Sequence, residues 1–565
     1  MIYIRYGEAD KQNVNDYSAF LSFNYNPDYV QEIKKLPCRF WNPDRKEWEI
    51  PINLVPMVKK FENNITELNQ APMFAPASKV NIEDLKFKTP SFPHQLEGVK
   101  YGIEHNNFLL GDQQGLGKTK QMIDLSVYKK QHNGLKHCLI ICGVNNLKYN
   151  WLDEIKKHSD ETGKVIGFTK PGKEPTMAER IEDLSKEPEE FFWITNIETL
   201  RCHKEGRFYK SEIVDIINDF IKKDILGLII VDEIHKAKNP TSMQGRGLLK
   251  IKGCQKIGLS GTLLVNKPMD LFMPLSFIQA LTMNYYQFLH RYTVQDIWGT
   301  PIGYQNMGEL QELMNNNMLR RTKELLDLPE KIYQPIYLEM SNDERRLYNE
   351  ILTATKKECD KISNPTLVLP KLTRMRQVLC HTGLVSTQVI KSTKFEKLRD
   401  ILEEAQINGE KVIVFSMFRE LIEMALKEFE DMKPLHIWGS MNQVELNNQK
   451  DAFQNTPGFQ VLFGQTMAAG TGHTLNEASI VVFLDLPWNK ATMEQAEDRA
   501  HRIGTKHTVT VISLLMKDSY DELLNKMIIE KASFGDILVD GKDSKEFRKF
   551  IRCIFKEESY DENIT

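Results

Sequence analysis

The sequence predicts an α/β protein with two parallel-sheet lobes, a helical segment between them and a small α+β module in front. Short apolar runs alternate with amphipathic helical stretches from residue 85 to about 275, and the alternation returns after about residue 390. This pattern is typical of a parallel sheet that helices cover on both faces. At 565 residues the chain is also too long for one hydrophobic core.

The apolar runs and the segment boundaries follow from this pattern. The first lobe is expected to use runs 108–110, 138–142, 191–194, 228–231 and 257–259 as strands, and the second lobe runs 412–415, 435–437, 461–463, 481–484 and 509–512. The predicted domains are an N-terminal module and linker (1–80), a first lobe (81–275), a helical between-lobe segment (276–390), a second lobe (391–525), and a C-terminal brace helix with a tail (526–565).

The composition narrows the class of protein. Hydrophobic residues at 41% and charged residues at 27% are ordinary for a soluble globular protein. No apolar run approaches the length of a membrane span, so we expect no membrane partner and a cytoplasmic or nuclear location. The eight cysteines form no CxxC pair, which predicts reduced thiols and no zinc site. The net charge of −3 means that any nucleic-acid contact must come from local clusters.

The stretch LLGDQQGLGKTKQ (109–121) lies between an apolar run and a predicted helix. Gly115 and Gly117 can adopt backbone angles that let successive N–H groups surround a phosphate at a helix N-terminus. Lys118 would add a positive charge, and Thr119 a hydroxyl ligand for Mg²⁺. The usual phosphate-loop pattern would have glycine at Asp112, and a glycine-rich turn with an exposed lysine is the alternative.

Two adjacent acids, Asp232 and Glu233, end the apolar run in LGLIIVDEIHKAKN (226–239). Ligands of open α/β sheets bind at the carboxyl ends of the strands. There Asp232 can hold Mg²⁺ while Glu233 polarises the water that attacks a γ-phosphate. A strand that ends in a solvated acidic turn is the alternative, and the ordered pair of motifs, 114 residues apart (232 − 118), disfavours it.

A third motif, QAEDRAHRIG (495–504), has Gln495, Arg499 and Arg502 at the spacing of one helical face. Two arginines from a second lobe would stabilise charge on a transferring phosphoryl group. Since the phosphate loop and these arginines belong to different lobes, we expect binding of the triphosphate to close the cleft between the lobes and its hydrolysis to let the cleft reopen. The alternative is a solvated helix face.

These motifs resemble the Swi/Snf-type (Snf-two) DNA-translocating ATPases of helicase superfamily two, over roughly residues 85–540. The segments run in family order: FPHQLEGV (92–99), DQQGLGKT (112–119), LIICGVNNLKYNWLDEI (139–155), ITNIETL (194–200), DEIHKAKN (232–239), LSGTLLVN (259–266), MLRRTKE (318–324), VIVFSMF (412–418), AAGTGHTLNEA (468–478) and QAEDRAHRIG. The resemblance implies two RecA-like lobes, and it accounts for Asp112, which is common at that position in the family.

The resemblance also implies roles for individual residues. The expected cofactors are ATP, with Gln95 reading adenine, and Mg²⁺, with Thr119 and Asp232 as ligands. Further expected nucleotide contacts are Asp112, Gly115, Gly117, Lys118, Gly470, Gly472 and Gln495. The expected catalytic residues are Lys118, Asp232, Glu233, Arg499 and Arg502, the coupling residues His235 and Ser260, and the DNA contacts Asn145, Lys148, Thr195, Asn196, Thr262, Arg320, Arg321, Ser416 and Thr466.

The sequence departs from the family pattern at a few positions. Gly143 stands where proline is common, Ile234 where alanine usually follows the acids, and Thr505 where the last motif usually ends in glutamine. His473 and Thr474 stand where Ile-Asn is frequent. None of these changes removes a catalytic group, so they bear on coupling rather than on ATP hydrolysis.

The N-terminal stretch FNYNPDYVQEIKKLPCRFWNPDRKEWEIP (23–51) resembles the HARP domain that precedes the motor in the annealing-helicase branch. Exposed aromatic side chains among Phe40, Trp41 and Trp48 would then stack on DNA at a branch point, and the basic residues Lys34, Lys35, Arg39, Arg45 and Lys46 would grip it there. These aromatics are also suited to a hydrophobic core. A protein partner bound through residues 1–80 is a further expectation.

The expected function is an ATP-dependent double-stranded DNA translocase that remodels branched DNA, by fork remodelling or strand annealing. The alternative is a motor that displaces or recycles a DNA-bound protein complex such as RNA polymerase. The HRIG and LRRTK segments disfavour an RNA helicase. A catalytically dead scaffold would predict damage at Lys118, Glu233 or Arg502, and all three are intact.

Overall fold

The computed structural model of the chain describes residues 1–8, 17–36, 38–69, 81–143, 147–167, 175–206, 208–261, 268–297, 299, 301–326, 328–359, 369–387, 392–466, 475–488, 490–502, 505 and 507–529. The chain divides into two compact units, Met1–Leu325 and Leu326–Thr565. The dividing point lies inside the 276–390 stretch, so this stretch contributes to both units.

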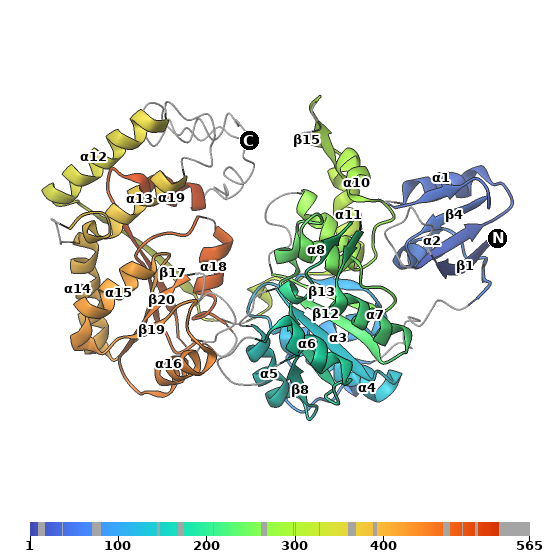
Figure 1. Cartoon of the computed structure of the whole chain (residues 1–565), viewed down its shortest axis with the longest axis horizontal. Coiled ribbons are helices and arrows are strands. Elements are labelled where there is room, and N and C mark those ends of the chain that lie inside the picture. The colour runs from blue at the N-terminus through green and yellow to red at the C-terminus, as the bar shows by residue number, and fades with distance from the viewer. Residues whose placement is uncertain are drawn as a thin grey trace. The chain divides into compact units, whose positions relative to one another are not determined.

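The first unit begins with a small α+β module, seen at the N-terminal end of the chain in Figure 1. Its five-stranded sheet has the order β3-β4-β2-β1-β5, in which β1 and β5 run parallel and the other pairs antiparallel. The elements are β1 (Ile2–Glu8), β2 (Tyr17–Ser22), α1 (Pro27–Lys35), β3 (Phe40–Asn42), β4 (Glu47–Ile50), α2 (Val55–Phe61) and β5 (Ile65–Glu67). The core of the module is continuous with the hydrophobic cluster of the following lobe.

The main sheet of the first unit has seven parallel strands in the order β16-β6-β13-β12-β7-β9-β8. The strands are β6 (Phe108–Leu110), β7 (His137–Cys142), β8 (Gly163–Val165), β9 (Phe192–Asn196), β12 (Leu226–Asp232), β13 (Gln255–Leu259) and β16 (Met318–Leu319). Neighbouring residues of a strand point to opposite faces. Thus Leu139 belongs to one hydrophobic cluster and Ile140 to the other.

Helices cover both faces of this sheet, as the alternation in the sequence predicts (Figure 1). Buried residues of α3 (Pro93–Glu104), α4 (Lys118–Asn133) and α5 (Leu147–His158) form one cluster with the sheet. The other face is covered by α6 (Met177–Ser185), α7 (Glu212–Lys222), α8 (Met243–Leu249) and α9 (Phe272–Phe277), with α10 (Tyr285–Tyr292) and α11 (Met307–Asn317) extending the same cluster. Two hairpins, β10 (His203–Glu205) with β11 (Phe208–Lys210) and β14 (Thr293–Gln295) with β15 (Pro301–Tyr304), complete the unit.

The second unit is built on six parallel strands in the order β17-β22-β21-β18-β20-β19. The strands are β17 (Lys331–Leu338), β18 (Lys411–Ser416), β19 (Leu435–Ile437), β20 (Gln460–Gln465), β21 (Ile480–Phe483) and β22 (Val509–Met516). Its helices are α12 (Asn342–Cys359), α13 (Leu369–Cys380), α14 (Thr393–Asn408), α15 (Arg419–Glu428), α16 (Gln443–Asn455), α18 (Lys490–Glu497) and α19 (Tyr520–Ile529). The prediction of two parallel-sheet α/β lobes is therefore confirmed.

Strand β17 is the main element that the sequence analysis did not anticipate. It lies in the stretch expected to be helical, and it pairs with β22 over eight residues. Pro335 sits within it, and proline is compatible with a strand only where its missing N–H is not needed, as at a sheet edge. Since β17 is the edge strand of its sheet, Pro335 is tolerated there.

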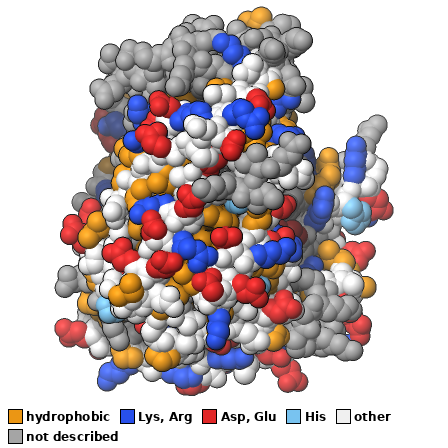
Figure 2. All heavy atoms as spheres, turned by 90° about the vertical axis from the view of Figure 1, so that its left-hand side faces the viewer, with side chains coloured by type: hydrophobic (Ala, Val, Ile, Leu, Met, Phe, Trp, Pro, Cys, Tyr) orange, Lys and Arg blue, Asp and Glu red, His pale blue; other side chains and the backbone are white. Residues whose placement is uncertain are grey.

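Charged groups of both signs share the surface. On the face shown in Figure 2, basic and acidic side chains are interspersed among the described residues, in keeping with the net charge of −3. Among the helices that the structure describes, none has both the length and the apolar character needed to cross a membrane. Six cysteines of the described ranges are buried and unbridged: Cys38, Cys138, Cys142, Cys202, Cys254 and Cys380.

Candidate functional site

The predicted phosphate loop connects β6 to α4, at the carboxyl end of its strand. Gly115 and Gly117 adopt φ angles of 92° and 77°, which residues with a Cβ rarely adopt. A Cβ on Gly117 would lie 2.2 Å from Nε2 of Gln95, so a side chain at this position would displace the Gln95 amide. Lys118 opens α4, and its Nζ donates to the carbonyl of Asp112 at 2.8 Å.

Gln95 lies against this loop from the first turn of α3. Its Oε1 accepts a hydrogen bond from the backbone N–H of Phe92 at 3.0 Å, which caps the helix. Its Nε2 donates to the carbonyl of Leu116 at 3.4 Å. The side-chain amide of Gln95 therefore holds this residue against the loop, where the sequence analysis expects it.

The side chain of Asp112 anchors the loop to the rest of the unit. It is fully buried, and both oxygens bind the guanidinium of Arg321, with Nε–Oδ1 at 3.0 Å and Nη2–Oδ2 at 2.5 Å. Gln121 donates to the same carboxylate at 3.0 Å. The backbone is tied down as well, because Gly111 and Gln113 donate to carbonyls of residues 319 and 321.

This arrangement differs from the roles expected for both partners. The sequence analysis places Asp112 among the nucleotide contacts and Arg321 among the DNA contacts. In the structure, the carboxylate of Asp112 is occupied by protein donors, and the side chain of Arg321 is 9% exposed. The two residues therefore stabilise the loop by binding it to the rest of the unit. The neighbouring Arg320 has an exposed side chain.

The acidic pair lies where β12 ends. Asp232 accepts hydrogen bonds from Nε1 of Trp151 at 3.0 Å and from the backbone N–H of Glu233 at 2.9 Å. Burial, followed by the nearby charge of Glu233, raises the pKa of Asp232 to about 6. A buried acid whose ionised form is disfavoured in this way would be stabilised by a bound cation.

Glu233 has an unusual backbone conformation, with φ 52° and ψ 49°. A residue with a Cβ rarely adopts this left-handed region, and such strain clusters at functional sites. Gly143 of the next strand end fits closely beneath it, because a Cβ there would lie 2.7 Å from the carbonyl oxygen of Glu233. The N–H of Gly143 donates to the carbonyl of Asp232 at 2.8 Å.

His235 and Ser260, expected as coupling residues, meet directly. Nδ1 of His235 lies 2.9 Å from Oγ of Ser260 and 3.2 Å from Oε2 of Glu233. Ser260 follows β13, whose neighbours are β6 and β12. A Cβ on Gly261 would lie 3.5 Å from Nζ of Lys118. The loop, the acids and the coupling pair therefore share one edge of the sheet.

The DNA contacts expected in the first unit are mostly buried. Thr195, Asn196 and Lys148 have side chains with 1%, 6% and 1% exposure, and the first two lie at the end of β9. Thr195 donates to Thr199, which donates to Oδ1 of Asn196 at 2.7 Å. Asn145, Thr262, Gly470 and Gly472 lie outside the described residues.

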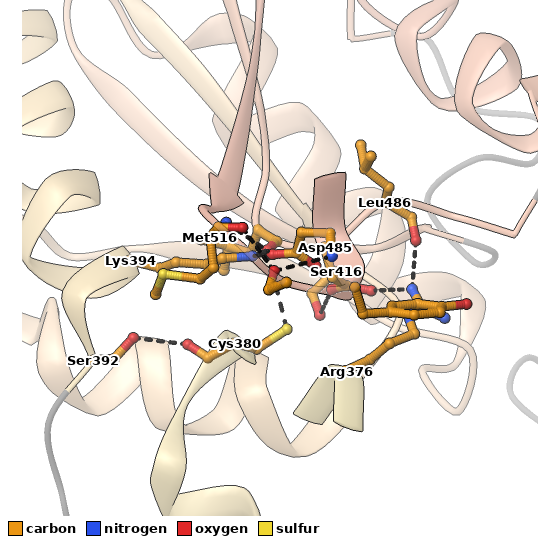
Figure 3. A network of polar contacts seen from close by, with 12 residues as sticks. Arg376, Cys380, Ser392, Lys394, Ser416, Asp485, Leu486 and Met516 are labelled. Atoms are coloured by element: carbon orange, nitrogen blue, oxygen red, sulfur yellow. Dashed lines mark hydrogen bonds and ion pairs between the residues drawn. The ribbon is translucent and has the colours of Figure 1, made fainter. Parts of the chain in front are cut away.

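Figure 3 shows a buried polar network in the second unit, centred on Asp485. Oδ1 of Asp485 accepts from Oγ of Ser416 at 2.6 Å, and Oδ2 accepts from Nη2 of Arg376 at 2.9 Å. Lys394, which is fully buried, donates to the carbonyl of Leu484 and to Asp521 of α19, both at 2.7 Å. Ser416 is therefore held by a network of hydrogen bonds and ion pairs. Thr466, another expected DNA contact, is buried at the end of β20.

The expectation that Gln495, Arg499 and Arg502 share one helical face is wrong. Helix α18 ends at Glu497, and Arg499 and Arg502 lie in the turns that follow. The acids at this end face the strand β17, because Nζ of Lys331 binds Glu497 at 2.8 Å and Asp498 at 3.2 Å. Such a long-range ion pair leaves no trace in the local spacing of the arginines.

One departure from the family pattern has a structural role in these turns. Oγ1 of Thr505 accepts from the backbone N–H of Arg502 at 3.0 Å and donates to the carbonyl of Ala500 at 2.8 Å. Thr505 therefore fixes the backbone of Arg502.

The sequence analysis did not identify several residues that shape the candidate site of the first unit and the polar network of the second unit. Trp151, the anchoring role of Arg321, and the pair Arg376–Asp485 were not assigned. Trp151 is contained in a recognised motif, but nothing in its sequence context indicates a bond to Asp232, 81 residues away. Arg376 is 2% exposed, and its local sequence does not indicate a bond to Asp485, 109 residues away.

Comparisons with known proteins agree on the class of both units. The family pattern described as SNF2-related domain matches residues 59–384, and the helicase conserved C-terminal domain matches residues 393–504. An uncharacterized ATP-dependent helicase of Mycoplasma pneumoniae is 28% identical over 514 residues, which is 86% of this chain and 46% of that protein.

Two mouse proteins show similar relationships. Chromodomain-helicase-DNA-binding protein 1-like is 28% identical, with 79% of this chain and 50% of the relative covered. DNA annealing helicase and endonuclease ZRANB3 is 26% identical, with 81% of this chain and 42% of the relative covered. The chain thus spans about half the length of these relatives or less.

Proposed function

Because the chain belongs to the SNF2-related family, we propose that it is a DNA-dependent ATPase that converts ATP hydrolysis into movement along double-stranded DNA. The observation that carries this proposal is the shared sheet edge of the first unit. There a glycine-containing loop with Lys118 and the acids Asp232 and Glu233 follow strands of one parallel sheet. The relatives named as ATP-dependent or DNA-binding helicases support the same class of reaction.

In this proposal the first unit binds the triphosphate and activates water. The backbone of the loop and Lys118 would hold the phosphates, and Gln95 would contact the adenine. Asp232 and Thr119 would hold Mg²⁺, which would neutralise charge on the phosphates. Glu233 accepts the proton of the attacking water, and its contact with His235 links that event to Ser260.

Residues of the second unit are proposed to act on the same reaction. Arg499 and Arg502 would stabilise the negative charge that develops on the transferring phosphoryl group, and Gln495, Gly470 and Gly472 would contribute nucleotide contacts. Thr505 would keep the backbone of Arg502 in place for this role. Because the two groups of residues belong to different units, hydrolysis would depend on both.

Contacts to the DNA backbone would convert the cycle into movement. Arg320, with its exposed side chain, is the direct candidate in the described part of the first unit. Further proposed contacts are Asn145, Lys148, Thr195, Asn196, Thr262, Ser416 and Thr466. Phosphate contacts of this kind position a motor without reading sequence.

We further propose that the DNA substrate is branched. The supporting relative is the mouse DNA annealing helicase, and the supporting feature is the aromatic surface of the N-terminal module. Phe40 and Trp41 are 38% and 42% exposed, and the ring of Trp41 lies 5.2 Å from that of Trp48. Exposed aromatic rings can stack on unpaired bases, which occur where strands separate. Displacement of a DNA-bound protein complex, through a partner bound to this module, is the second candidate.

The first test is steady-state ATP hydrolysis with no nucleic acid, single-stranded DNA, blunt duplex, forked duplex and RNA. We expect strong stimulation by duplex or forked DNA, abolished by Lys118→Ala. Stimulation by RNA alone would contradict the substrate, and a lack of stimulation by every nucleic acid would favour the protein-complex candidate.

A second test addresses branched DNA. Deleting residues 1–80 would expose the core that the module shares with the lobe, so point variants are preferable. The double variant Phe40→Ala/Trp41→Ala should lose the fork response and keep the response to blunt duplex. Tyr25→Ala is the control, since Tyr25 is 84% exposed on the same module. Equal loss with both substrates would contradict branch recognition.

A further inference from the structure

A cavity lies between the N-terminal module and helix α10 of the first unit. Its volume is about 270 Å³, and its lining residues are Lys34 of α1, Arg39, Trp48 of β4, Met283 and Arg291 of α10. None of these residues belongs to the sheet edge that carries Lys118 and the acids. The cavity is therefore a second candidate site, and both the module and the lobe contribute to it.

The charge in this cavity is unbalanced. Arg291 binds Glu309 through two hydrogen bonds, with Nε–Oε1 at 2.6 Å and Nη2–Oε2 at 2.5 Å. Within the described ranges, no carboxylate lies within ion-pair distance of Arg39 or Lys34, and Arg39 donates to the carbonyl of Leu36. Three cations and one carboxylate leave two positive charges (3 − 1) around the cavity.

Arg39 is held close to a group of like charge. Burial, followed by the neighbouring charge of Arg291, lowers the pKa of Arg39. A cation in this position is stabilised when an anion is placed beside it. A phosphate group suits two neighbouring guanidinium groups because its oxygens can accept several parallel N–H bonds.

The remaining walls are apolar. Trp48 and Met283 line the cavity, and Trp48 is itself packed against Trp41. An indole ring presents a flat face to which a base or a sugar ring can stack. The combination of two unbalanced positive charges with an aromatic wall, in a volume close to the lower end of small-molecule sites, suits one nucleotide rather than a folded peptide segment.

We propose that this cavity binds one phosphate-bearing nucleotide of a nucleic-acid strand, with its phosphate at Arg39, Lys34 and Arg291 and its base or sugar against Trp48. The inference rests on the proposed function in that the strand belongs to the DNA on which the motor acts. The bound phosphate can be internal to the strand or stand at its end, and both share this chemistry. Because α10 belongs to the lobe, occupancy would join the module to the lobe.

The test measures binding of the full-length protein to fluorescent forked DNA by anisotropy. We expect Arg39→Gln to weaken binding roughly tenfold, the size of one lost charge-assisted hydrogen-bonding group, and Lys34→Gln roughly threefold. The slope of log affinity against log salt should fall by about one for Arg39→Gln. Lys60→Gln is the matched control, because Lys60 is exposed on α2 of the same module and does not line the cavity.

Two arms distinguish the source of the phosphate. If a phosphorylated strand end is bound, dephosphorylated forks should bind more weakly, and deoxyadenosine monophosphate should compete in wild type but not in Arg39→Gln. If an internal phosphate is bound, removal of the terminal phosphates should change nothing while Arg39→Gln still weakens binding. Either result supports the cavity as a phosphate site.

The proposal is overturned if Arg39→Gln and Lys34→Gln both bind forks as tightly as Lys60→Gln. Lys34 is exposed, so Lys34→Gln is decisive even if Arg39→Gln unfolds the module. The proposed function is judged separately by stimulation of ATP hydrolysis with blunt duplex. If both cavity variants bind forks normally and show normal stimulation of ATP hydrolysis, the proposed phosphate site is wrong. The proposed DNA-dependent ATPase activity is then unaffected.

Discussion

Arg321 and Asp112 form a buried ion pair that joins the predicted phosphate loop to the segment that follows strand β16. The guanidinium meets both carboxylate oxygens, at 3.0 and 2.5 Å, across 209 residues of sequence. The same guanidinium donates to Oε1 of Gln121 at 2.8 Å and to the carbonyl of His94. The loop is thus fixed by a residue from the far end of the first unit, and its shape depends on that pair.

Arg321→Ala should therefore destabilise the first unit and raise the KM for ATP. Removing one partner of a buried pair leaves the other charge unpaired, and we expect a loss of roughly 3–5 kcal/mol in the free energy of unfolding. Urea unfolding and ATP titrations measure both effects. Arg320→Ala is the matched control and should change the stability by no more than about 0.5 kcal/mol. An equal loss in both variants would show that the pair does not fix the loop.

The acidic pair predicts a pH-dependent stability. The pKa of Asp232 is about 6 in the folded protein, above its ordinary value, so the folded state binds the proton more tightly than the unfolded state. The associated stability is present at low pH and is lost as the pH rises through about 6.

Glu233→Gln should weaken this effect, because it removes the charge that helps to raise the pKa of Asp232. Without nucleotide or metal, we expect the variant to be about 1 kcal/mol more stable than wild type at pH 7.5, and the difference to shrink as the pH falls below 6. Urea unfolding at several pH values checks this. Glu189→Gln, at an exposed position, should show no such trend. A pH-independent difference would mean that the two acids do not interact.

Gly143→Pro, which restores the residue common in the family, should be unfavourable in this chain. Proline cannot donate the hydrogen bond that Gly143 gives to Asp232, and its Cβ would lie 2.7 Å from the carbonyl oxygen of Glu233. We expect a loss of roughly 2 kcal/mol or more in the free energy of unfolding, together with reduced ATP hydrolysis. Gly308→Ala, where a Cβ would meet no atom within 4 Å, should be neutral or stabilising. Wild-type behaviour of Gly143→Pro would mean that the two strand ends separate readily.

Arg376→Ala and Arg374→Ala provide a matched pair in the second unit. Arg376 is 2% exposed and binds Asp485, whereas Arg374 on the same helix is exposed. Loss of Arg376 leaves Asp485 buried without its cation, and we expect a destabilisation of roughly 3–5 kcal/mol. Arg374→Ala should change stability by no more than about 0.5 kcal/mol. Thermal unfolding of both variants decides, and similar melting temperatures would contradict a structural role for Arg376.

Local pattern was sufficient to place many elements of the two sheets. The apolar runs predicted as strands all lie in or overlap strands of the two parallel sheets, and the loop from 111 to 117 lies between β6 and α4. Periodicity and glycine positions report on the backbone within a few residues, and for that reason such features are readable without a structure. The edge strand β17 was not predicted because Pro335 and its neighbours form no continuous apolar run.

By itself, the sequence determined the α/β class, the order of the motifs and the position of the acids at the end of β12. Only the tertiary structure decided that Arg321 supports the loop, that Arg376 is buried against Asp485, and that α18 ends before Arg499. Each of these facts depends on a partner from a distant segment, Asp112, Asp485 or Lys331, that folding brings into contact. An arginine side chain has the same chemistry whether it is exposed to water or part of a buried ion pair. Burial in the folded chain alone determines which of these two environments the side chain has.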